Sequence, residues 1–190
     1  ATVVCKNQRT TRRTVDFQKG FAAAKSGDYA TALREWTPIA KQGNASAQSN
    51  LGYMYEKGKG VPQDYKTAVK WYRLAAEQGY AIAQFNLGNA YNKGKGVPQD
   101  YKTAVKWWRL AAEQGDADAQ SNLGVMYDNG HGVLQDYVRA HMWFNIAAIS
   151  GDVENASKNR DIVAKRMNSN QIETAQKLAR ECFLKKYKGC

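Results

Sequence analysis

Apolar and small residues recur along the chain with helical spacing, in stretches separated by glycine-rich connections. The stretch 81–92 has this spacing, and glycines and a proline interrupt it over 94–98. A second apolar stretch follows Asp100, which stands where it would cap a helix, and Gly115 stands where it would end that helix. The apolar positions of the two stretches are Ala83, Leu87, Ala90 and Tyr91, then Ala104, Trp107, Trp108, Ala111 and Ala112. The pattern predicts two helices joined by an ordered loop.

This pair of stretches repeats with a period of 36 residues. Lys57–Gly79 returns as Lys93–Gly115 with a single change, Tyr72 to Trp108, and a more divergent third copy follows up to Gly151. One helix pair cannot bury its own apolar face, so a repeat at such a period predicts stacked units. We therefore expect one all-α domain, an α-solenoid of about ten helices, large enough for a continuous core.

Glycines and aromatic residues hold equivalent places in each copy. Gly52, Gly88 and Gly124 lie in the middle of predicted helices, where glycine costs about 1 kcal/mol against alanine. Such a cost is tolerated where a backbone or a ring must approach closely. The aromatic residues at two adjacent repeat positions are Trp71, Trp107 and Trp143, then Tyr72, Trp108 and Phe144. Since a cofactor site would be a singular feature, these recurring residues predict a core between repeats.

The chain divides into a short arm and one repeat domain. Residues 1–16 lack periodicity and predict a disordered or weakly ordered basic arm. The domain, 17–190, divides into an N-terminal capping unit (17–43), full repeats (44–79, 80–115 and 116–151) and a C-terminal capping helix pair (152–190). The first unit has a shorter connection and lacks the Leu-Gly pair, and Asn168 with Gln171 resembles a capping box for the last helix. No apolar run reaches the roughly 20 residues of a membrane-spanning helix.

The net charge of +11 is concentrated at the two ends of the chain. Residues 1–15 contribute four positive charges, and 158–190 contribute nine positive and three negative ones. No helix combines a continuous basic stripe with stacking aromatics, so nucleic-acid binding is disfavoured against charged, solvated ends.

Motifs for catalysis or metal binding are missing from the sequence. There is no G-x-S-x-G and no S-x-x-K with K-T-G, and the GKGVPQ loops lack the ending of a P-loop. His131 and His141 stand ten apart without a carboxylate or thiolate at metal spacing. We expect a protein that is not an enzyme and holds neither a cofactor nor a metal.

The three full copies share a longer motif, A-x-A-Q-x-N-L-G-x-x-Y-x-x-G-x-G-V-x-Q-D-Y-x-x-A-x-x-W-[YWF]-x-x-A-A-x-x-G. It resembles the Sel-one-like repeat (SLR), a relative of the tetratricopeptide repeat. The resemblance implies a right-handed α-solenoid, in a family whose members mostly act as scaffolds or adaptors for other proteins. Many bacterial members are exported, and one disulfide-rich branch has been described as binding penicillins. The resemblance therefore favours a binding protein for a protein or peptide, with penicillin-like binding or β-lactamase-like activity as the alternative. We expect the protein to be a monomer.

In tetratricopeptide-like stacks the first helix of each pair lines the concave surface. This resemblance places in the groove Ser46, Ser49, Tyr53 and Glu56, then Ile82, Phe85, Asn89 and Asn92, then Asp118, Ser121, Val125 and Asp128. These residues differ between copies, as a specific binding surface requires; the alternative is packing against neighbouring helices, above all for Phe85. Asn50, Asn86 and Asn122 recur beside them, either to hold a peptide backbone or carboxylate or to bond across the repeat.

The chain has three cysteines, of which Cys5 lies in the predicted arm. Cys182 and Cys190 would be about 12 Å apart on one continuous helix, too far for a disulfide. Gly189 indicates that the helix has ended, which lets the tail fold back. Disulfide-rich relatives pair cysteines at this separation, between the helices of a repeat. The hypothesis is a Cys182–Cys190 bridge in a periplasmic or secreted protein, and the alternative is two reduced thiols.

Overall fold

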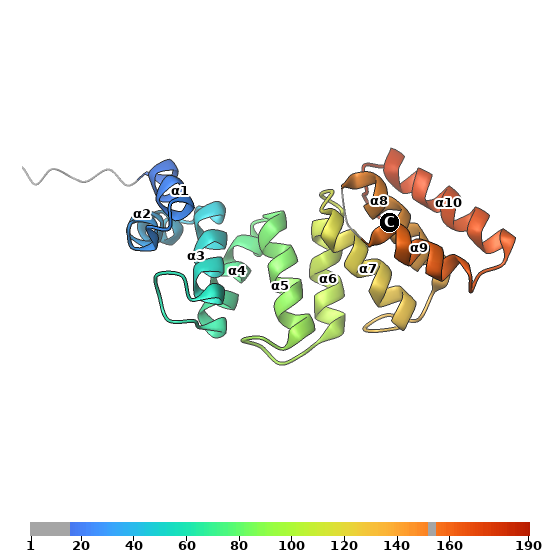
Figure 1. Cartoon of the computed structure of the whole chain (residues 1–190), viewed down its shortest axis with the longest axis horizontal. Helices are drawn as coiled ribbons and strands as arrows, with labels where there is room; N and C mark the ends of the chain where they lie inside the picture. The colour runs from blue at the N-terminus through green and yellow to red at the C-terminus, as the bar shows by residue number, and fades with distance from the viewer. Residues whose placement is uncertain (1–15, 152–154) are drawn as a thin grey trace, which may run out of the picture.

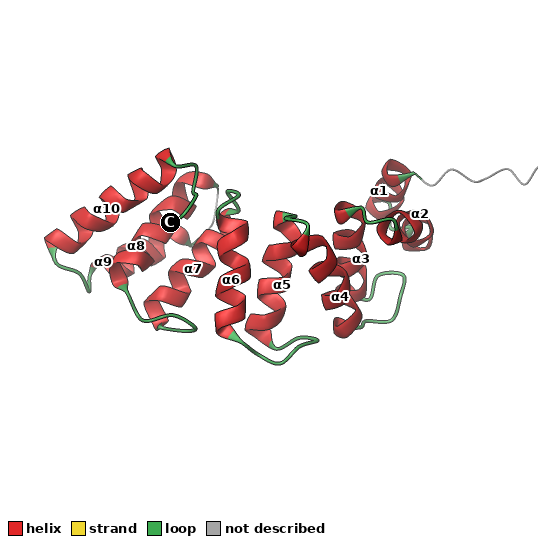
Figure 2. Ribbon diagram, turned by 180° about the vertical axis from the view of Figure 1, so that it is seen from behind, coloured by secondary structure: helices red, strands yellow, loops and turns green. Residues whose placement is uncertain are grey.

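The structure, a computed structural model, describes residues 16–151 and 155–190, and in these ranges it consists of helices and loops arranged as stacked pairs in an elongated row (Figures 1 and 2). Within the described residues there are ten helices, α1 (Phe17–Lys25), α2 (Tyr29–Lys41), α3 (Ala45–Lys57), α4 (Tyr65–Glu77), α5 (Ala81–Lys93), α6 (Tyr101–Ala112), α7 (Ala117–Asn129), α8 (Tyr137–Ser150), α9 (Ala156–Ala164) and α10 (Ser169–Leu184). The predicted all-α repeat fold is confirmed. Cys5 and the predicted arm up to residue 15 lie outside the described residues.

An aspartate caps the second helix in each of the first four helix pairs. Asp100 accepts a hydrogen bond from the backbone N–H of Thr103 at 3.1 Å and so caps α6, as predicted. Asp28, Asp64 and Asp136 cap α2, α4 and α8 in the same way. The predicted capping box of Asn168 and Gln171 is present at α10. Recurrent caps give each unit the same helix register, which lets the units stack alike.

A ring lies directly on the glycine in the middle of each first helix. A Cβ on Gly88 would lie 2.6 Å from Cδ1 of Trp108, a side chain that is only 1% exposed. Tyr72 lies as closely on Gly52, and Phe144 on Gly124, which is the approach that the sequence predicted. The first unit has the same contact between Gly20 and Trp36. This contact does not follow from the repeat pattern, because the shorter connection moves Gly20 out of the 36-residue register.

The recurring tryptophan beside this ring lies between repeats. Trp71 packs against the core formed by α1, α2 and α3, and Trp107 packs against that of α4 and α5. Both are half-buried, whereas Trp143 is fully buried on α8, the helix against which α10 packs. The prediction of a core position is therefore confirmed for Trp143 and only in part for the other two.

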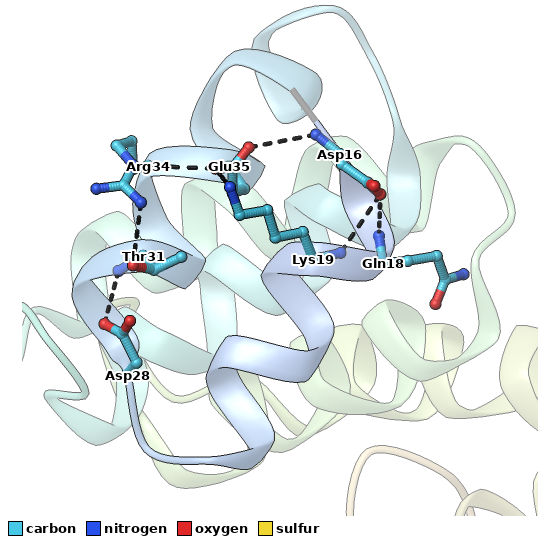
Figure 3. A network of polar contacts seen from close by, with 7 residues as sticks. All are labelled: Asp16, Gln18, Lys19, Asp28, Thr31, Arg34 and Glu35. Carbon is cyan, nitrogen blue, oxygen red and sulfur yellow. Dashed lines mark hydrogen bonds and ion pairs between the residues drawn. The ribbon is translucent and has the colours of Figure 1, made fainter. Parts of the chain in front are cut away.

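The first unit has Glu35 where the later units have this tryptophan. Glu35 is 1% exposed and accepts a hydrogen bond from the backbone N–H of Asp16 at 3.3 Å (Figure 3). Its carboxylate also lies 3.4 Å from Lys19 Nζ and 3.9 Å from Arg34 Nε. A charged network thus stands at the start of the stack, in the place where an aromatic ring would otherwise meet a preceding repeat.

Buried glutamines tie each first helix to the unit before it. The Nε2 of Gln84 donates to the carbonyl of Ala76 at 3.1 Å, and Gln48 and Gln120 bond in the same way to the ends of α2 and α6. Gln114 in turn donates to Oε1 of Gln84 at 2.8 Å. Hydrophobic periodicity predicts no role for these glutamines, although their recurrence in every full copy is a signal that they matter.

The glycine-rich loops hold the preceding unit at the start of its second helix. Lys95 Nζ lies 5.0 Å above the ring of Tyr65, and the His131 ring stacks on Tyr101 at 4.9 Å. Gly96 has φ +76°, and a side chain there would collide with the backbone of Tyr65. The loops are thus structural clamps, which explains why they recur once per repeat.

The C-terminal helices depart from the repeat geometry. Helix α9 takes the place of the next first helix, but α10 packs against α8 rather than against α9 (Figure 1). The two last helices are therefore not a pair of the kind found earlier in the chain. Cys182 and Cys190 are joined by a disulfide with their Cα atoms 5.6 Å apart, which holds the tail against the end of α10. None of the helices in the described ranges is long and apolar enough to span a membrane.

Candidate functional site

Helices α3, α4 and α5 line a cavity of about 290 Å³, here called the α3–α5 cavity. Five residues predicted for the groove line it together: Tyr53, Glu56, Phe85, Asn86 and Asn89. The other lining residues are Lys57, Tyr65, Ala68, Val69, Tyr72, Ala90, Lys93 and Lys95. The cavity thus combines aromatic walls, amide groups and lysines, and it is contributed by two consecutive repeats.

A second cavity of about 290 Å³ lies between α1, α2 and α3 and is here called the α1–α3 cavity. Its walls include Phe21, Trp36 and Asn50, and Tyr53 lines both cavities. The Tyr53 side chain is 42% exposed, and its hydroxyl accepts a hydrogen bond from Lys59 Nζ at 3.2 Å. Tyr53 therefore stands between two neighbouring hollows, each large enough for a side chain of a ligand.

The charge of the α3–α5 cavity is positive. Glu56 accepts a hydrogen bond from the Tyr72 hydroxyl at 2.9 Å and pairs with Lys57 Nζ at 2.6 Å. The hydrogen bond to Glu56 raises the pKa of Lys57, and burial raises the pKa of Tyr72, so both groups keep their protons at neutral pH. Because Lys57 compensates the one acid of the lining, Lys93 and Lys95 leave the cavity with an excess of positive charge.

The three recurring asparagines make no side-chain hydrogen bond within the described residues. Asn50, Asn86 and Asn122 are all half-buried, at the same position of α3, α5 and α7. Asn50 lines the α1–α3 cavity and Asn86 lines the α3–α5 cavity. The bond across the repeat that the sequence left as an alternative is therefore not formed in this part of the chain. Their amides keep two donors and an acceptor for a ligand or for water.

The remaining predicted groove residues lie outside these two cavities. Ser49 and Ser121 are buried, at 3% and 9% exposure, and so offer little surface to a ligand. Ile82 is 53% exposed, Asp118 is exposed and Asn92 is half-buried. Ser46 is also half-buried and donates a hydrogen bond to the Tyr80 hydroxyl at 2.9 Å. The structure thus brings together the predicted residues of α3 and α5 nearest to Tyr53.

In the third repeat the predicted surface is engaged by the chain itself. Asp128 forms an ion pair with Arg166 at 2.7 Å, and the Arg166 guanidinium lies over the ring of Tyr137. Val125 is half-buried and packs against the core beside α8, and Phe85 packs against the same core from α5. The connection between α9 and α10 therefore engages the predicted groove at Asp128, at the end of α7, whereas Tyr53 remains exposed.

The histidines are held in structural settings. His141 is 4% exposed, and its pKa is lowered by burial and by the nearby charge of Arg160. His131 stacks on Tyr101 at another place in the array. Among the described residues no group of three or more histidine, cysteine or acidic side chains is placed to hold a metal ion.

Comparison with known proteins identifies the repeats. The family model of the Sel1 repeat matches residues 45–80, 81–116 and 117–152. The crystal structure of a Sel1 repeat protein from Oxalobacter formigenes is 32% identical, with a TM-score of 0.69, over 88% of this chain and 76% of that one. A search of curated proteins found no significant match.

A second solved structure is that of a protective antigen of uropathogenic Escherichia coli strains, which displays an SLR fold. It is 32% identical to this chain with a TM-score of 0.64, and the match covers 90% of this chain but 45% of that protein. Three consecutive family matches cover more than half of the 190 residues, and both solved structures share the stacked-helix architecture. The chain belongs to the Sel1 repeat family.

Proposed function

We propose that this protein is a non-catalytic binding protein that holds a peptide segment of a partner protein along α3 and α5. The observation that carries the proposal is the row of half-buried asparagines whose side chains have no hydrogen-bond partner in the described residues. Two of them, Asn50 and Asn86, line neighbouring cavities that share Tyr53. Half-buried amides of this kind gain most from a ligand that supplies the missing bonds.

A peptide backbone suits such a row because its N–H and C=O groups are the same along its length. An amide in each repeat bonds to the backbone whatever the peptide sequence is, as in other modes of peptide recognition. Specificity then comes from side chains that enter the cavities on either side of Tyr53. The lysines of the α3–α5 cavity add a preference for an acidic or uncharged segment over a basic one.

The disulfide supports a place for the protein outside the reducing cytosol. Bridges such as Cys182–Cys190 persist in oxidising compartments. We propose that the protein is exported to the periplasm or secreted, and that it acts as a monomer.

Photo-crosslinking in cells tests the binding site. A photoreactive amino acid at Tyr53 is expected to capture a partner, whereas the same amino acid at Phe183, which is 50% exposed on α10, is the matched control. Asn86→Ala should abolish capture from Tyr53 and leave the melting temperature nearly unchanged, since this side chain makes no hydrogen bond within the described residues. Equal capture from both positions, or capture that survives Asn86→Ala, contradicts the proposed groove. Turnover of a penicillin by the purified protein contradicts the non-catalytic assignment.

A further inference from the structure

We propose that the exposed face of α4 is a second docking site, which takes an amphipathic helix with acidic flanks from a partner protein. A groove of about 470 Å³ runs between α4 and the loop that follows α5, and we call it the α4 groove. Its apolar floor consists of Val69, Leu74 and Val97. Its remaining side chains are the cations Lys66, Lys70 and Arg73, with no acidic residue in the lining. Val69 also lines the α3–α5 cavity, but none of the asparagines lines the α4 groove, and the proposal does not depend on them.

One of the apolar side chains that line the α4 groove is exposed to solvent. Leu74 is 46% exposed in the last turn of α4, and Leu110 at the same position of α6 is 37% exposed. Lys102 and Lys106 repeat Lys66 and Lys70 around Leu110. An exposed leucine set among lysines thus occurs in two adjacent repeats, which makes a surface longer than one groove.

The chain itself shows which kind of element fits this face. On α8 the equivalent position is Ile146, which is only 1% exposed, because α10 packs against α8. Met142 of α8 faces Leu178 and Cys182 of α10 across a small cavity, and it stands where α4 has Lys70. The exposed side of a second helix in this stack therefore accepts a helix laid across it, and on α8 that helix belongs to the same chain.

At the repeat position where α8 has Met142, α4 and α6 have Lys70 and Lys106. These lysines determine which partner helix would fit. Lys66 and Lys70 form no ion pair within the described residues, and Arg73 donates to the Tyr91 hydroxyl at 2.7 Å. A helix that buries Leu74 must bring these ammonium groups close, so carboxylates beside its apolar stripe complement them. The chain's own residues 1–15 carry four basic residues and no acidic one, and α10 is already placed on α8. Neither of these two segments suits the groove, and the proposed occupant is a segment of another protein.

A designed peptide tests the α4 groove on the full chain. The probe is a fluorescent helix of about 18 residues with leucines along one face and glutamates on both sides of them. Its matched control keeps the leucines and has lysine in place of each glutamate. We expect the glutamate peptide to bind, and Lys70→Glu with Lys106→Glu to weaken its affinity by about tenfold or more in fluorescence anisotropy. Lys177→Glu, on the exposed side of α10, should leave the affinity unchanged.

The outcomes separate this site from the groove at Tyr53. Tyr53→Ala should leave the affinity of the glutamate peptide unchanged, so the two proposals stand or fall independently. Equal binding of the lysine peptide, or an affinity that survives Lys70→Glu with Lys106→Glu, overturns the proposal. Binding to phosphatidylglycerol vesicles without binding to the glutamate peptide also overturns it, because the surface would then serve a membrane. Circular dichroism of each variant shows that a loss of binding is not a loss of fold.

Discussion

The contact between Gly88 and Trp108 predicts that a usually favourable substitution is harmful here. In an exposed helix, Gly→Ala stabilises by about 1 kcal/mol. At Gly88 the new Cβ would lie 2.6 Å from both Cδ1 and Nε1 of the indole. The indole is 1% exposed, and its Nε1 donates to the carbonyl of Phe85 at 3.2 Å, so it has little room to move away. Overpacking of this kind costs about 1–3 kcal/mol.

We therefore expect Gly88→Ala to destabilise the protein by up to about 2 kcal/mol after the helix gain is subtracted. For a chain of this size, the melting temperature should fall by up to about 8 °C. In the background of Trp108→Ala the obstacle is removed, and Gly88→Ala should then stabilise by about 1 kcal/mol. Thermal and urea unfolding of the four proteins in this cycle measure the reversal of sign. A rise in melting temperature on Gly88→Ala in the intact protein would refute the argument that the ring excludes a side chain.

Two further predictions concern the C-terminal part of the array. Burial lowers the pKa of His141 in the folded state. The neutral imidazole therefore contributes its full stabilisation above a pH of about 6.5, and this stabilisation is lost as the pH falls below that value. His141→Val should flatten the fall in melting temperature between about pH 7 and pH 5, and an unchanged slope would contradict this. Thiol titration of the non-reduced, unfolded protein should find one free thiol, that of Cys5, and reduction of the Cys182–Cys190 bridge should lower the free energy of unfolding by about 2–3 kcal/mol; three free thiols would disprove the bridge.

The sequence was sufficient for the fold because its signals are either local or recur with the same period. Asp100 as a cap, Gly88 under a ring and the capping box of Asn168 and Gln171 all depend on residues close in sequence or on one repeated contact. The role of Gln84 was missed because a hydrogen bond to the carbonyl of Ala76 leaves no mark in hydrophobic periodicity. The recurrence of a residue therefore indicates that it is structurally important, but it does not indicate which contact the residue makes.

The candidate site was predicted only in part because copies that look equivalent have different neighbours. The positions of Tyr53 and Val125 correspond, yet Tyr53 is exposed between two cavities and Val125 packs against the core. Asp128 corresponds to Glu56, but Arg166 from the C-terminal connection pairs with it. The accessible part of the groove depends on which segments pack at the C-terminal end of the stack. The helix geometry within one repeat does not show which segments these are.

Repeat positions at which one copy has a different type of residue indicate contacts that the repeated residues do not indicate. Where α4 and α6 have Lys70 and Lys106, α8 has Met142, which faces α10. Glu35 in place of tryptophan similarly marks the start of the stack, where a charged network replaces an aromatic contact. The same reasoning applies in reverse to Leu74, which stays exposed among cations because nothing in the described chain covers it. Met142 and Glu35 thus mark contacts within the chain, whereas the exposed Leu74 marks the face at which we propose a contact with another molecule.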